Sequence, residues 1–191
     1  MQIAIWLCLL PALLFGALSV LAPLRMSHLG WSAAAIGATF FVSAGFEAAW
    51  APVLGRVSDR YGRLLPLRMA LLASGIGVAL LPWPERAWLL AAAVVWAGFA
   101  FGNFWTPAMS MVTDEAEHVG LDYGYAFALV SIAWAPGQAV GAAIGGAIAS
   151  ATTDAVPYLA LALLCFLTFA AVARYRDAAA RSAALWTTRD G

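Results

Sequence analysis

Six long apolar stretches in this 191-residue chain restrict what it can fold into. An apolar helix of roughly 20 residues spans the hydrocarbon core of a bilayer, which is about 30 Å thick. Each stretch has about this length, and charged residues, Pro or Gly stand in the short segments between them. The pattern therefore predicts six transmembrane helices, at residues 3–24, 31–54, 64–81, 87–111, 123–149 and 156–173.

The composition agrees with a membrane protein and excludes other classes. Hydrophobic residues make up 64% of the chain and charged residues 10%, whereas soluble domains carry about 25% charged residues. The net charge is zero and every basic residue is an arginine, so no basic excess marks a nucleic acid as a partner. We therefore expect an all-α fold, a polytopic integral membrane bundle in contact with membrane lipid.

Side chains that carry enzymatic chemistry are scarce. Cys8 and Cys165 lie in separate apolar stretches, with no His or Cys at metal-ligand spacing beside them. His28 and His118 fall in the connections between stretches. No Ser/His pair, paired Asp or His/Glu cluster lies at membrane depth. We expect no catalytic residue, no metal and no cofactor, which makes an intramembrane enzyme the least favoured class.

The arginines predict the orientation, because positively charged connections stay in the cytoplasm. With both termini in the cytoplasm, only Arg25 and Arg86 lie on the outer side. We therefore expect a multi-pass protein of the plasma membrane with both termini cytoplasmic. Its domains are then a six-helix bundle at residues 1–174 and a cytoplasmic tail at residues 175–191.

Polar residues follow one face of the fourth stretch. Asn103, Thr106 and Ser110 are spaced three and four residues apart, as on one side of a helix. Polar groups that face lipid are costly, so this face is a candidate wall of a substrate cavity. In the alternative interpretation, the hydroxyls bond to their own helix backbone and Asn103 joins two helices.

The fifth stretch combines polar and small residues. Trp134 and Gln138 share a face, and both substrate contact and a hydrogen bond between helices remain open for them. Small residues at every fourth position let a neighbouring helix approach closely. This spacing predicts helix packing for Gly137, Gly141 and Gly145, and we expect the adjacent Gly146 to belong to the same packing face.

Glu47 is the only carboxylate deep within a predicted span. It lies roughly eight residues, or about 12 Å at the helical rise, from the cytoplasmic end of its stretch. An ionisable residue at that depth is a functional candidate, and Glu47 is our candidate proton site. The alternative is a carboxyl group that stays protonated or hydrogen-bonded and braces its helix near Pro52.

The most specific pattern is Gly55-Arg-Val-Ser-Asp59-Arg60-Tyr-Gly62-Arg63, between the second and third stretches. Two antiparallel membrane helices need a tight connection here. Gly55 and Gly62 permit close packing and left-handed backbone angles, and Asp59 can cap a helix. Arg60 and Arg63 can pair with acids or lipid phosphates.

This pattern resembles the signature Gly-x-x-x-Asp-Arg-x-Gly-Arg of the major facilitator superfamily. Each six-helix half of those transporters carries the signature between its second and third helices. All five specified positions match, whereas the basic residue that often follows is Leu64 here. The resemblance implies that the connection stabilises one of two alternating conformations through charge contacts. It implies Asp114 as the partner of Arg60 or Arg63.

The resemblance covers the whole chain but only one of the family's two halves, in which a three-plus-three inverted repeat is common. The runs Phe-Trp-Thr-Pro-Ala and Ala-Trp-Ala-Pro-Gly-Gln look like those of a C-terminal half. The resemblance implies that the chain is half of a secondary transporter, with a small-molecule substrate bound between it and a second six-helix half. The second half would belong to the same longer chain or to another copy.

A different class remains open beside the transporter. A membrane assembly protein, or an inactive transporter fragment, keeps the same fold without moving a substrate. The feature that separates these classes is whether the polar faces of the fourth and fifth stretches line a cavity open to water. The sequence does not identify the substrate.

Overall fold

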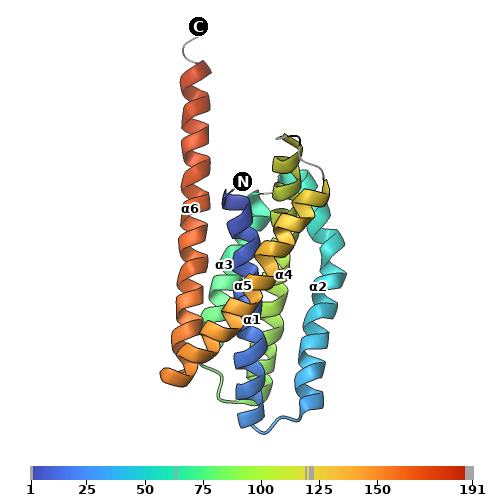
Figure 1. Cartoon of the computed structure of the whole chain (residues 1–191), viewed down its shortest axis with the longest axis vertical. Helices are drawn as coiled ribbons and strands as arrows, with labels where there is room; N and C mark the ends of the chain where they lie inside the picture. The colour runs from blue at the N-terminus through green and yellow to red at the C-terminus, as the bar shows by residue number, and fades with distance from the viewer. Residues whose placement is uncertain (1, 63, 119, 121–122, 188–191) are drawn as a thin grey trace.

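Six helices form a bundle in the computed structural model, which describes residues 2–62, 64–118, 120 and 123–187. Successive helices run antiparallel, so that both termini lie at the same end (Figure 1). The described residues contain no strand, and the predicted all-α fold is confirmed. The helices are α1 (Gln2–His28), α2 (Ala33–Tyr61), α3 (Leu64–Leu80), α4 (Ala87–His118), α5 (Tyr123–Ala151) and α6 (Ala155–Thr187).

Several helices extend beyond the apolar stretches that predicted them. α2 continues to Tyr61 instead of residue 54, α4 to His118 instead of 111, and α6 to Thr187 instead of 173. Hydropathy marks only the part of a helix that suits lipid, whereas backbone hydrogen bonding continues into water. The proposed division at residue 174 falls inside α6, and it stays a prediction.

Four helices contain described segments long and apolar enough to cross a bilayer: Ile5–His28, Ala33–Tyr61, Val130–Ala151 and Ala155–Arg174. The apolar segments Leu64–Leu80 and Ala87–Asn103 are shorter. The first of these has 17 residues, the lower end of the length that spans a bilayer, about 17–25 residues. Together with the antiparallel arrangement, these lengths describe a multi-pass membrane protein.

α1 is the central helix of the bundle. Leu7, Leu10, Leu14, Leu18 and Leu21 are at most 3% exposed, and the helix packs against both α4 and α5. The α1–α5 pair is the most extensive contact of the fold. A Cβ atom on Gly141 of α5 would overlap the backbone of Leu13, and one on Gly16 of α1 would overlap the carbonyl oxygen of Gln138. The two helices therefore touch backbone to backbone, which only small residues allow.

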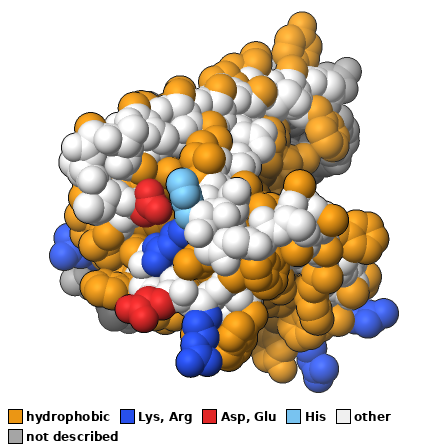
Figure 2. Space-filling view, turned by 90° about the horizontal axis from the view of Figure 1, so that it is seen from below, with side chains coloured by type: hydrophobic (Ala, Val, Ile, Leu, Met, Phe, Trp, Pro, Cys, Tyr) orange, Lys and Arg blue, Asp and Glu red, His pale blue; other side chains and the backbone are white. Residues whose placement is uncertain are grey.

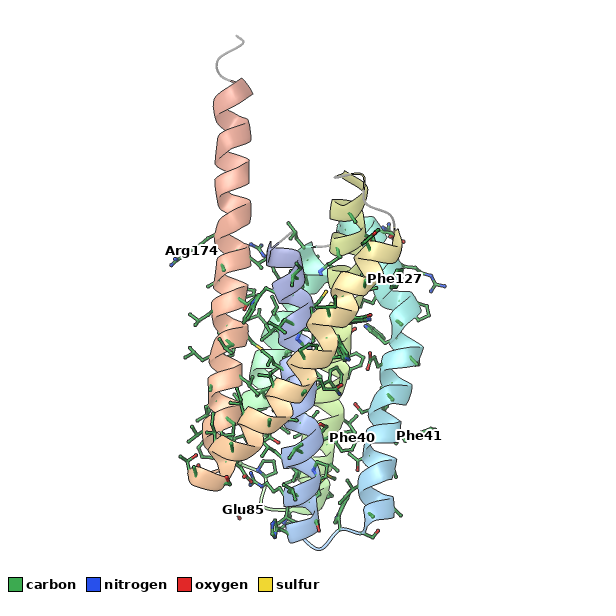
Figure 3. The ribbon with its side chains drawn as sticks, in the orientation of Figure 1. Phe40, Phe41, Glu85, Phe127 and Arg174 are labelled. Carbon is green, nitrogen blue, oxygen red and sulfur yellow. The ribbon has the colours of Figure 1, made fainter. Side chains whose placement is uncertain are left out.

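The remaining helices flank this pair. α3 packs against α4 and α6, and α2 packs mainly against α4 at the edge opposite α6 (Figure 1). Among the described residues of α2, only Thr39, Ser43 and Leu54 are buried. α2 turns Phe40 towards the bundle and Phe41 away from it (Figure 3), and the side chain of Phe41 is 80% exposed.

Two polar contacts tie distant parts of the chain together. Arg25, in the last turn of α1, donates from Nη1 to the carbonyl of Leu81 at 3.3 Å and from Nη2 to the carbonyl of Pro84 at 3.0 Å. It thereby satisfies carbonyl groups where α3 ends, which lack partners within their own helix. At the other end of the bundle, Trp6 Nε1 donates to Thr168 Oγ1 of α6 at 3.0 Å.

Gly141→Ala tests the α1–α5 contact. The added methyl group meets backbone of Leu13, which cannot rotate away, so we expect a loss of roughly 1–3 kcal/mol in the free energy of unfolding. The two cysteines of the chain are both buried, so a thiol-reactive fluorophore in detergent reports thermal unfolding. The matched control is Gly45→Ala, where a Cβ meets nothing within 4 Å. Equal melting temperatures for the two variants would contradict the close contact.

Arg25→Ala tests the connection between α3 and α4. Loss of the guanidinium group removes two hydrogen bonds to backbone carbonyls, and we expect roughly 1–3 kcal/mol of destabilisation in the same thermal assay. Arg86→Ala removes an exposed arginine of the same connection and serves as the control. If Arg86→Ala lowers the melting temperature as much as Arg25→Ala does, the hydrogen bonds are not the cause.

Candidate functional site

A face of the bundle between α2 and α5 is not covered by another helix in the described part of the chain. α4 packs against both α2 and α5, but within the described part of the chain α2 and α5 do not pack against each other. The space-filling view shows a notch on the side where Figure 1 places α2 (Figure 2). In this view a group of acidic, basic and histidine side chains lies at the centre and left, away from the notch. We call the face of α4 and α5 that turns towards α2 the open face.

An aromatic cluster lies where α1, α4 and α5 meet. The ring centroids of Trp105 on α4 and Trp134 on α5 are 4.4 Å apart, and Trp134 lies 5.8 Å from Phe15 on α1. Phe15 in turn meets the buried ring of Phe101 edge to face at 5.4 Å. The sequence singled out Trp134 but not Trp105 or Phe15, because their proximity depends on how three helices pack.

Of the polar candidates of α4, Asn103 bonds through its side chain to its own helix. Asn103 is half-buried, and its Nδ2 donates to the carbonyl of Phe99 at 2.7 Å. Ser110 is half-buried and its carbonyl accepts from Thr113 at 2.9 Å. The side chain of Thr106 lies outside the described residues. The Asn103 bond fits the helix-bonding alternative for its amide nitrogen, and the candidate cavity role of these residues stays a prediction.

On α5, the polar face and the glycine face point in different directions. Gln138 and Ser131 are exposed, with Trp134 half-buried between them. The glycines face α1: Gly137 lies against Leu9 and Ala12, Gly141 against Leu13 and Gly145 against Ala17. A Cβ atom added to Gly146 would lie 3.8 Å from Cγ1 of Val20, an ordinary van der Waals contact. The structure thus separates the two groups of candidates into a surface facing outwards and a packed interface.

The motif residues occupy the end of α2 instead of a loop. Residues 55–61 are helical, and Gly62 ends the helix with φ 80°. The expectation of a looped motif was therefore wrong for these residues, because the helix continues past the apolar stretch. Of the two motif glycines, Gly62 has a positive φ angle, which glycine adopts readily, and Gly55 does not. Asp59 and Arg60 are exposed, and the Arg60 guanidinium lies 6.0 Å from the ring of Tyr61.

The charge contact between Asp114 and Arg60 or Arg63, which the family resemblance implies, falls outside the part of the chain that the structure describes. Arg63 and the side chain of Asp114 lie outside the described residues. Pairing of Asp114 with Arg60 or Arg63 therefore stays a prediction.

Glu47 is half-buried on α2 beside α4. A Cβ atom on Gly102 of α4 would overlap its carboxyl group. One turn earlier, Ser43 Oγ donates to the carbonyl of Val95 at 3.4 Å. The carboxyl group is thus held at the contact between two helices.

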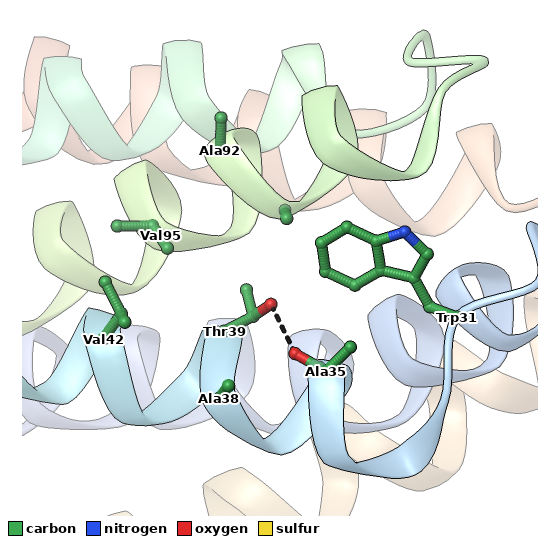
Figure 4. A pocket seen from close by; sticks show the side chains of 8 residues that line it. Trp31, Ala35, Ala38, Thr39, Val42, Ala92 and Val95 are labelled. Carbon is green, nitrogen blue, oxygen red and sulfur yellow. Dashed lines mark hydrogen bonds between the residues drawn. The ribbon is translucent and has the colours of Figure 1, made fainter.

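A separate apolar pocket of about 360 Å³ lies between α2 and α4, near Trp31 (Figure 4). Its one hydroxyl group belongs to Thr39, which donates to the carbonyl of Ala35 at 2.9 Å and so bonds to its own helix. None of the candidate residues lines this pocket, whose walls are Trp31, Ala35, Ala38, Thr39, Val42, Ala91, Ala92 and Val95. It offers a ligand apolar contact alone.

The bundle and its composition define an α-helical multi-pass membrane protein, and comparison with known families gives a narrower assignment. Residues 5–186 match the Major Facilitator Superfamily. The chain belongs to this family of transporters, which confirms the resemblance of its motif. Within the described residues, no three metal-binding side chains come together.

Relatives that match include bacterial proteins described as uncharacterised MFS-type transporters. An uncharacterised MFS-type transporter of Yersinia pestis (strain Pestoides F) is 34% identical over 113 residues, which cover 58% of this chain and 28% of that protein. The uncharacterised MFS-type transporter YcaD of Escherichia coli O139:H28 is 32% identical over 114 residues, covering 58% and 28% respectively. The match therefore spans far less than two thirds of either relative's length.

Cysteine labelling tests whether the open face is in contact with water. After replacement of Cys8 and Cys165 by Ala, we expect Gln138→Cys to react with a membrane-impermeant maleimide in proteoliposomes. Leu163→Cys on α6 is the control, because Leu163 is exposed on a helix that does not pack against α2 or α4 in the described residues, and we expect lipid around it. Equal, slow labelling of both positions would show that lipid or protein covers the open face.

Proposed function

We propose that the chain is one six-helix half, the C-terminal one, of a secondary transporter that moves small molecules by alternating access. The observation that carries this proposal is the open face, where the described residues of α2 and α5 flank α4 without packing against each other. In transporters of this architecture the substrate lies between two such halves near the midplane of the membrane. The open face provides one wall of such a site.

The chemistry of this wall supports small, largely uncharged or amphiphilic substrates. Trp105 and Trp134 provide aromatic surface, and Gln138 is exposed beside them. Ligand sites commonly combine apolar and aromatic walls with a few polar groups that fix orientation. Transport, and not catalysis, is the function that we propose for this set of residues.

A second six-helix half is the partner that completes the site. Exposed apolar and aromatic side chains on α2 and α5 include Phe46, Trp50 and Ile132, and lipid or a facing bundle must cover them within the membrane. We propose that the second half belongs to the same longer protein or is another copy of this chain. The partial coverage of the relatives supports the first arrangement.

The placement of charge supports an orientation with both termini in the cytoplasm of a plasma-membrane protein. Arg174 and Glu85 mark opposite ends of the bundle (Figure 3). Arg60 at the end of α2 lies at the end of the bundle that also holds the start of α1, as positively charged segments do on the cytoplasmic side. Arg60 is exposed there and is free of the bundle core, which suits a charge contact that forms in only one of two conformations. We propose Asp114 as the partner of Arg60 or Arg63.

Glu47 is the residue we propose as the proton site. Its carboxyl group lies within an apolar span at a helix contact, where gain or loss of charge has a large energetic effect. A change in protonation there alters the contact between α2 and α4. This links a proton gradient to movement of a helix that borders the open face.

Transport measurements test the function. The chain alone, and the chain joined to the coding sequence directly upstream, are compared in proteoliposomes for proton-driven flux of a panel of amphiphilic compounds. We expect only the joined form to transport, because one half supplies one wall of the site. Transport by the chain alone would favour a homodimer, and no transport by either form would contradict the proposed function.

Substitution of Glu47 tests proton coupling in whichever form transports. Glu47→Gln keeps the size of the side chain but cannot exchange a proton, so we expect loss of proton-driven flux. Glu85→Gln changes an exposed carboxylate outside the helices and should leave flux unchanged. If Glu47→Gln retains normal proton-driven flux, the proton site lies elsewhere.

A further inference from the structure

Two glycines of α4 face two polar side chains of α2 at matching intervals. A Cβ atom on Gly98 would overlap the hydroxyl of Ser43, and a Cβ atom on Gly102 would overlap the carboxyl group of Glu47. The two glycines are four residues apart on α4, and the two polar residues are four residues apart on α2. The two contacts therefore lie one helical turn apart. The absent side chains leave two recesses on α4, and polar groups of α2 occupy both.

Occupation by polar groups distinguishes this contact from the glycine interface of α1 and α5. There, glycines meet the backbone or apolar side chains of the partner helix, as Gly141 meets Leu13. At the α2–α4 contact, Ser43 is buried and its hydroxyl donates to the carbonyl of Val95. One turn further along α2, the carboxyl group of Glu47 lies against the buried Gly102.

We infer that Gly102, with Gly98 beside it, is a positioning residue for Glu47, because its recess holds the carboxyl group against α4 and away from lipid. This inference rests on the proposed role of Glu47 in proton coupling. A glycine here does more than allow close packing, because it fixes where the ionisable group sits. Any side chain at 102 displaces the carboxyl group from the α2–α4 contact.

Among the described side chains, the charged groups on α2 and on the helices around it bond elsewhere or lie away from Glu47. Arg25 of α1 bonds to the carbonyls of Leu81 and Pro84, and Arg68 of α3 bonds to the carbonyl of Val172. On α4, Arg86 precedes the helix, and the acidic residues and His118 lie in its last turns, where their side chains are outside the described residues. On α2 itself, Arg56, Asp59 and Arg60 lie more than two turns further on.

The recess therefore dominates the local environment of the carboxyl group. A methyl group at 102 meets the end of a flexible side chain, which can rotate out of the way. The fold should survive the change, unlike a substitution that meets backbone. The group that moves is the carboxyl group, so its reactivity and its proton exchange are the properties that change.

An apolar carbodiimide tests the inference without requiring transport. The reagent reacts with protonated carboxyl groups in the membrane, and mass spectrometry quantifies the adduct at Glu47 across a pH series. We expect Gly102→Ala to be labelled several-fold faster than the unaltered chain, with a changed pH midpoint. Gly45→Ala, on α2 and without a neighbour within 4 Å, should match the unaltered chain. Labelling of denatured protein confirms that Glu47 can react.

The outcomes separate this inference from the proposed function. Equal rates and midpoints for Gly102→Ala and the unaltered chain would overturn the positioning role, even if Glu47→Gln abolishes transport. Faster labelling of Gly102→Ala together with normal proton-driven flux of Glu47→Gln would support the recess and reject the proton site. The thiol-reactive melting assay checks that Gly102→Ala is folded, and Gly102→Ser, which also adds a Cβ, should increase labelling in the same way.

Discussion

The absence of water in the bilayer core is the constraint on which this structure depends. A backbone group without a partner there costs several kcal/mol, so spanning segments form helices that satisfy their own backbone. Once the backbone is satisfied, the helices gain little by hiding leucine from lipid, and close packing must hold them together. In this chain the glycines of α5 supply that packing against α1.

The two glycine-rich contacts divide the bundle by its chemistry. α1 and α5 meet through backbone and apolar atoms, so their contact does not respond to charge. The contact between α2 and α4 also contains a hydroxyl and a carboxyl group, so a change of charge can affect it. Because α4 also packs against α5, a rearrangement of α2 on α4 takes place beside a firmly held pair. This arrangement suits a bundle in which one edge helix changes position while the centre stays intact.

The sequence predicted the helices well and their contacts in part. Apolar length identified all six helices, but it placed the end of α2 seven residues early, at 54 instead of Tyr61, because hydropathy does not follow a helix into water. The spacing of Gly137, Gly141 and Gly145 indicated a packing face without naming α1 as its partner. Gly102 could not be linked to Glu47, and Trp105 could not be linked to Trp134, because neither contact exists until particular helices are paired.

The hydrogen bond from Trp6 to Thr168 joins positions 162 residues apart, and this separation bears on how the bundle assembles. α1 enters the membrane before α5 and α6 are synthesised, so its leucine surface first lies in lipid. Lipid tails are as apolar as leucine, so exposure of α1 to lipid at this stage costs little free energy. Its Trp6 indole, by contrast, lacks its partner until α6 inserts. Assembly around the central helix is therefore completed late, when the last helix arrives.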